Sequence, residues 1–188
     1  MKKAAAIIAT VFGLLANPVK AETSELQAAL SNGLVACQNW VLEPKTWTEN
    51  DTLFAAKIGL EGKLLPMGGI PSGVLPEGLL TLATNFWRID GGNGNGVFVV
   101  ASTTNPVCNV AGGGPSDLQP EVEMLITKIS QGQDWKIADS KRQDDMTTTS
   151  FKSIADSKSE LVVSRASKAG DRTDRVQFLA TVTFNPGN

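Results

Sequence analysis

The chain has 188 residues, with 17 Lys and Arg against 19 Asp and Glu, two cysteines and no histidine. Without histidine, Ser-His-Asp and Cys-His nucleophiles and histidine-ligated zinc are excluded. Lys and Arg are scattered singly among acidic residues, which argues against binding to nucleic acid or to an anionic membrane surface.

Residues 1–21 have the pattern of a cleaved secretory signal peptide. Lys2 and Lys3 precede an apolar run from Ala4 to Ala16, and Val19-Lys20-Ala21 provides a cleavage site. A membrane-spanning helix needs about 20 apolar residues, so we expect no transmembrane segment. We therefore expect an exported protein, periplasmic or secreted, in which residues 22–188 form a single domain.

A first helix is expected to begin near Ser24 and to end before Pro44. Thr23 or Ser24 can cap its start, and Ser24 has the capping-box spacing with Gln27. Its apolar stripe is Leu26, Leu30, Leu34, Cys37 and Val41. Cys37 therefore faces the core. In an oxidising compartment, a disulfide between Cys37 and Cys108 is the expected state, and two buried free thiols are the alternative.

The next segments are a short strand and a long loop. Residues 53–60 are apolar and are interpreted as a strand, although a helical turn has the same pattern. Residues 62–80 hold five glycines and three prolines, which exclude a helix or a central strand. This loop is unusually apolar for a surface segment.

A hairpin and a second helix follow. Residues 84–90 and 97–102 flank a run of Gly and Asn that suits a hairpin turn, and Val97-Phe98-Val99-Val100 predicts a central strand covered on both faces. After a turn at residues 112–115, Ser116 or Asp117 caps a helix with Pro120 in its first turn and Gly132 at its end.

The last third predicts strands at 135–141, 146–154, 160–166 and 176–184. The last of these alternates apolar and polar residues, which is the period of a strand with one face on a core. Helix, strands, helix and strands with short turns indicate an α+β fold, a two-layer domain with an antiparallel sheet and two helices packed on one face.

No segment carries a recognisable catalytic, cofactor or metal motif. The Gly91–Gly96 run lacks the ligands of a calcium loop and does not open a helix as a phosphate-binding loop would. Acidic residues are numerous but show no spacing typical of a catalytic pair, and Asp144-Asp145 is interpreted as a solvated turn. Trp40, Trp47, Trp87 and Trp135 could line a ligand site, but core packing is favoured. We expect no cofactor and no catalytic activity.

The sequence therefore favours a non-catalytic protein that binds an unknown protein partner or a small ligand. The candidate binding segment is the apolar loop, defined here as residues 64–80, because its side chains either cover the sheet as a lid or present a patch. The candidate binding residues are Leu64, Leu65, Met67, Ile70, Val74 and Leu75. The alternatives are a periplasmic carrier of a small ligand, with a cavity between sheet and helices, and a carboxylate-dependent hydrolase.

Overall fold

The structure, a computed structural model, describes residues 24–44, 51–168, 170 and 176–185. The predicted signal peptide, residues 1–21, lies outside the described residues. The helices are α1 (Glu25–Leu42), α2 (Asp51–Lys57), α3 (Glu77–Leu80) and α4 (Gln119–Gln131). The strands are β1 (Leu65–Met67), β2 (Asn85–Asp90), β3 (Gly96–Ala101), β4 (Val107–Gly113), β5 (Trp135–Gln143), β6 (Met146–Ser153), β7 (Ser159–Ala166) and β8 (Phe178–Phe184).

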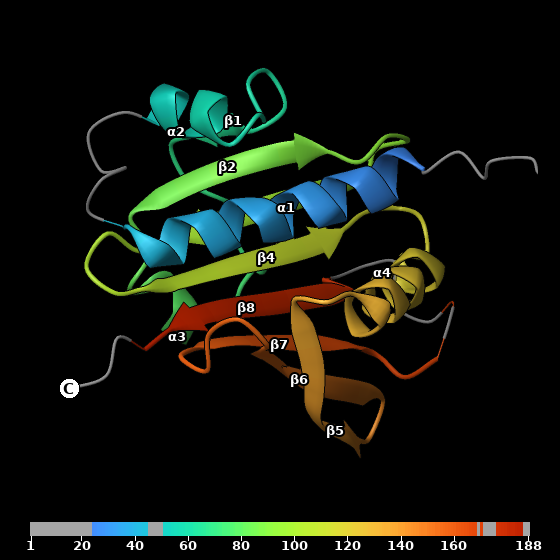
Figure 1. Cartoon of the computed structure of the whole chain (residues 1–188). Coiled ribbons are helices and arrows are strands. Elements are labelled where there is room, and N and C mark those ends of the chain that lie inside the picture. Colours follow the sequence, from blue (N-terminus) through green and yellow to red (C-terminus); the bar gives the residue numbers. More distant parts are fainter. Residues whose placement is uncertain (1–23, 45–50, 169, 171–175, 186–188) are drawn as a thin grey trace, which may run out of the picture.

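The described strands form one antiparallel sheet in the order β1-β2-β3-β4-β8-β7-β6-β5 (Figure 1). Strands β1 to β4 and strands β5 to β7 are each paired in chain order. Strand β8 joins the two groups because it pairs with both β4 and β7. The predicted α+β class and antiparallel sheet are confirmed.

Helix α1 lies on one face of the sheet, lengthwise along β2 and β4, and contacts β2, β3, β4 and β8 (Figure 1). It begins where the sequence predicts, because the Ser24 hydroxyl accepts a hydrogen bond from the backbone N–H of Gln27 at 3.1 Å. The predicted stripe is buried, from Leu26 to Val41. The predicted disulfide is present between Cys37 on α1 and Cys108 on β4, and both residues are fully buried.

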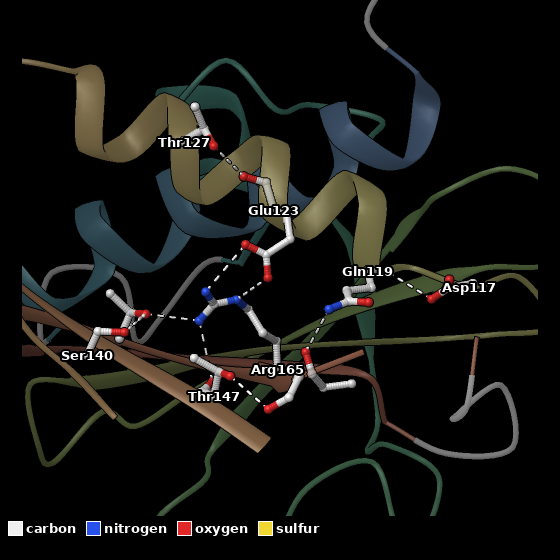
Figure 2. A network of polar contacts seen from close by, with 10 residues as sticks. Asp117, Gln119, Glu123, Thr127, Ser140, Thr147 and Arg165 are labelled. Atoms are coloured by element: carbon white, nitrogen blue, oxygen red, sulfur yellow. Dashed lines mark hydrogen bonds and ion pairs between the residues drawn. The ribbon is translucent and has the colours of Figure 1, made fainter. Parts of the chain in front are cut away.

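Helix α4 is held to the second group of strands by a polar network around Arg165 (Figure 2). Arg165 on β7 is buried, and its Nε lies 2.6 Å from Oε1 of Glu123 on α4. Its guanidinium also donates to Thr149 Oγ1 at 2.9 Å. At the start of α4, the Gln119 side chain donates to the backbone carbonyl of Ala166 at 3.0 Å. Each polar group of Arg165 thus has a partner between helix and sheet, as a buried charge requires.

Consecutive residues of β3 point to opposite faces of the sheet, and both faces are covered. Val97 and Val99 pack in the main core with α1, whereas Val100 belongs to a second cluster with Leu75 and Ala111. Loop residues complete that second cluster, so we call this side of the sheet the loop face. The prediction of a central strand covered on both faces is confirmed, and the apolar loop is the second cover.

Four sequence-based predictions are wrong. Neither Ser116 nor Asp117 is the N-cap of α4, because the helix starts one residue later, with Leu118 as an N-cap that makes no side-chain hydrogen bond. Residues 53–60 do not form a strand: α2 ends at Lys57, and its Phe54 is fully buried against Trp40 and Trp87. The turn predicted at residues 112–115 starts later, because β4 continues through Gly113 and pairs with β3 and β8. The loop at 62–80 is not continuous, since it contains β1 and α3.

Candidate functional site

A groove with a cavity volume of about 590 Å³ lies on the loop face, between the apolar loop and the ends of β2, β3 and β4. One wall is formed by Met67, Pro71, Ser72, Gly73 and Val74 of the loop. The remaining lining is Arg88, Gly94, Gly96, Phe98, Gly112, Gly113, Gly114 and Val176. We call this cavity the loop-face groove. Its volume falls within the range of about 300–1,000 Å³ that is typical of small-ligand sites.

Glycine opens the floor of the groove. Gly96 on β3 and Gly113 on β4 are cross-strand partners, so neither strand places a side chain at this point of the sheet. A Cβ on Gly96 would lie 3.4 Å from the Phe98 ring and 3.5 Å from Arg88 Nε, which are ordinary contact distances. Glycine inside a strand is unfavourable for the strand itself and often marks a place where another molecule approaches the backbone.

The turns at the rim of the groove are fixed by two buried amides, Asn95 and Gln177. Asn95 Nδ2 donates to the Gly92 carbonyl at 3.1 Å and to Ser116 Oγ at 3.2 Å. Its Oδ1 accepts from the Ser116 backbone N–H at 3.3 Å. This amide therefore ties the β2–β3 turn to the turn that follows β4.

Gln177 closes the same rim from the segment that precedes β8. Its Oε1 accepts from the Leu118 backbone N–H at 2.8 Å, and its Nε2 donates to the Ser116 carbonyl at 2.8 Å. Gln177 is 5% exposed, so these bonds satisfy an amide that would otherwise be buried without partners. The groove is therefore preformed on one side by hydrogen-bonded turns.

Arg88 is the charged side chain among the residues that line the groove. It projects from β2, where its cross-strand partner is Phe98. Both side chains flank the space above Gly96, so a guanidinium and an aromatic ring lie next to each other on the floor. Among the ion pairs of the described ranges, none involves Arg88.

The predicted binding residues are divided among several environments. Met67 and Val74 line the groove. Ile70 and Leu75 pack in the loop-face cluster, where Leu75 is 3% exposed. Leu64 is buried in the main core, and Leu65 is half exposed beside a smaller cavity of about 310 Å³ near α1. The structure thus brings two of the six into one cavity.

Arg88, Phe98 and the floor glycines had no sequence signal strong enough to select them. They lie on strands that are separated along the chain, and the antiparallel register alone brings them together. The density of glycine at residues 91–96 and 112–114 was the available hint, since both runs exceed the needs of a simple hairpin turn.

The acidic and tryptophan residues considered as catalytic or binding candidates are dispersed over the described part of the chain. Asp144 and Asp145 form the turn between β5 and β6, and Asp139 is ion-paired with Lys141 at 2.9 Å. Lys141 holds the pKa of Asp139 below its ordinary value, chiefly through their hydrogen bond. Within the described ranges, no three acidic or cysteine side chains are grouped as metal ligands. Trp40 and Trp87 are fully buried in the core, and Trp135 is nearly so, whereas Trp47 lies outside the described residues.

None of the helices in the described ranges has the length and apolar character needed to cross a bilayer. A scan against protein-family models found no match, and searches of curated proteins and of solved structures found no similar protein. The loop-face groove is therefore the candidate functional site.

Proposed function

We propose that this protein is an exported, non-catalytic binding protein that holds a small apolar ligand in the loop-face groove. The observation that carries the proposal is the cavity itself, about 590 Å³ between the apolar loop and a glycine floor. Export is supported by the signal-like residues 1–21 and by the buried disulfide, because such bonds persist in oxidising compartments. Two helices layered on one side of the sheet would leave the other side for the loop and its ligand.

A small ligand fits this site better than a large protein partner. The loop turns most of its apolar side chains toward the sheet, where Leu75 is 3% exposed and Ile70, Val74, Leu79 and Leu80 are partly buried. The accessible feature is therefore the loop-face groove beside the loop, and not a broad apolar patch on the outer side of the loop. Hollows of this kind bury much of a small ligand, whereas protein partners need an interface of about 800 Å² on each side.

The test uses a neutral fluorescent hydrophobic probe, N-phenyl-1-naphthylamine, with the protein lacking residues 1–21. We expect saturable binding to one site. Gly96→Leu places a side chain on the groove floor and should weaken binding by about tenfold or more. Gly78→Leu is the matched control, because Gly78 lies on α3 with no atom near its Cβ position, and it should bind as the original protein does.

Folding of each variant is checked by circular dichroism and thermal unfolding. No saturable binding by the original protein, or equal binding by a folded Gly96→Leu variant, would contradict the proposal. Equal loss of binding in both variants would show that the added leucine acts through general destabilisation instead of through the groove.

A further inference from the structure

We infer that the ligand of the loop-face groove is an anionic amphiphile of the fatty-carboxylate class, bound as a single free molecule with its carboxylate on Arg88. This inference rests on the proposed binding function and adds the chemical class of the ligand. It follows from the placement of Arg88, which is the charged residue of the described lining, from the character of the walls and from the volume.

Arg88 lines the groove from β2 and is exposed. Arg88 Nε is 3.5 Å from the position that a Gly96 Cβ would occupy, and the Phe98 ring approaches the same position at 3.4 Å. Replacing glycine at position 96 would therefore fill the space next to the guanidinium. Arg88 is exposed, so its positive charge is open to solvent at the groove.

The charge of the groove favours a carboxylate. No acidic residue belongs to its described lining, and the ion pairs of the described ranges do not use Arg88. Elsewhere on the sheet, Lys141 and Lys152 are paired with Asp139 and Glu160. A guanidinium presents a planar fork of N–H donors that matches a carboxylate with two parallel hydrogen bonds.

The walls favour an apolar chain attached to that carboxylate. Met67, Pro71 and Val74 face the groove from the loop, while Phe98 and Val176 face it from the sheet side. These five side chains offer no hydrogen-bond donor, and Ser72 adds a hydroxyl at the loop wall. An apolar chain therefore gains most from burial against these walls. Each methylene that becomes fully buried should strengthen binding by about fourfold. A volume of about 590 Å³ accommodates one such chain.

The experiment compares three amphiphiles with the same ten-carbon chain, all below their critical micelle concentrations. Decanoate, decanol and decyltrimethylammonium compete against N-phenyl-1-naphthylamine on the protein lacking residues 1–21. We expect decanoate to displace the probe at a concentration at least about tenfold lower than decanol, and decyltrimethylammonium to be the weakest. Dodecanoate should bind more tightly than octanoate.

Three variants test whether Arg88 causes the preference for decanoate over decanol. Arg88→Gln should remove the advantage of decanoate over decanol, and Arg88→Lys should retain part of it. Lys152→Gln removes a positive charge from β6, outside the groove lining, and should keep the full preference.

The possible failures are distinguishable. If the neutral probe binds but decanoate and decanol compete equally, or if folded Arg88→Gln retains the preference, the carboxylate assignment is overturned and the binding function stands. If the neutral probe itself does not bind, both proposals fail. Co-sedimentation with phosphatidylglycerol vesicles that depends on Arg88 would also overturn the single-molecule assignment, because the charge would then serve a membrane surface.

Discussion

Removal of the disulfide should lower the stability of the protein by an amount set largely by chain entropy. The perturbation is the double variant Cys37→Ala/Cys108→Ala, which leaves no lone thiol. The two cysteines are 71 positions apart, so the crosslink closes a long loop in the unfolded chain. The chain-entropy model assigns a loop of this length about 4 kcal/mol of stabilisation.

The assay is equilibrium unfolding in urea, followed by tryptophan fluorescence and by circular dichroism. The free energy of unfolding should fall by about 4 kcal/mol, which for a domain of this size corresponds to a decrease in melting temperature of about 8–16 °C. The unfolded variant should expose more surface than the crosslinked chain, so the dependence of the free energy on urea should become steeper. Both probes should report the same transition.

The native structure should survive, because α1 also packs against four strands through its buried apolar stripe. A decrease below about 1 kcal/mol with an unchanged urea dependence would refute the reasoning, since the bond would then not constrain the unfolded chain. Reducing the original protein during unfolding should reproduce the stability of the double variant, which provides an independent check.

Three further predictions test the loop, the rim of the groove and an exposed ion pair. Leu75→Ala should destabilise the protein by about 2–4 kcal/mol in urea unfolding, because this side chain is 3% exposed in the loop-face cluster. Leu65→Ala, at 49% exposed, should change stability by less than about 0.5 kcal/mol, and equal effects would contradict the covering role of the loop. Gly114→Ala should cost more than about 1 kcal/mol, because φ is +152° and the new Cβ would contact the Asn95 side chain, whereas Gly78→Ala on α3 should be neutral or slightly stabilising. In an NMR titration, the pKa of Asp139 should lie below that of an isolated aspartate and should rise toward it in Lys141→Met; an unchanged pKa would show that Lys141 is not the cause. Any stability contributed by this exposed pair is present above the unfolded-state pKa of aspartate and is lost as the pH falls through the lowered pKa of Asp139.

The sequence predicted the elements whose signals are local. Helix α1 has a single apolar stripe and a serine cap, and α4 has Pro120 in its first turn and Gly132 at its end. The turn between β2 and β3 is also local, because Asn93 and its neighbouring glycines adopt the positive φ values that such residues tolerate. Each of these features needs only a short window of sequence.

Strand β4 could not be recognised in the sequence because the composition of its last residues resembles that of a turn. It ends in Gly112-Gly113, which break an apolar pattern in the sequence. In the structure, a Cβ on Gly112 would lie 3.1 Å from Leu118 and 3.4 Å from Leu30, so glycine is what lets both helices approach the strand. Tertiary packing therefore decides this position, and no local propensity could reveal it.

The groove could not be predicted from the sequence for a related reason. The sequence identified the apolar loop, which forms one wall, but the floor depends on the register that places Gly96 opposite Gly113 and Phe98 opposite Arg88. Register is a property of strand pairing across the sheet, and it is specified by the whole buried pattern instead of by any single segment.

The position of β8 in the sheet has a consequence for biosynthesis. Strands β4 and β7 each have one edge that pairs only with β8, and β8 is the last described strand of the chain. During synthesis, the first four strands can pair with one another, but β4 keeps an open edge until residues 178–184 emerge. A chain interrupted before this strand would expose two unpaired edges, which are the surfaces through which β-proteins associate incorrectly. The same order delays completion of the sheet until residues 178–184 have been synthesised.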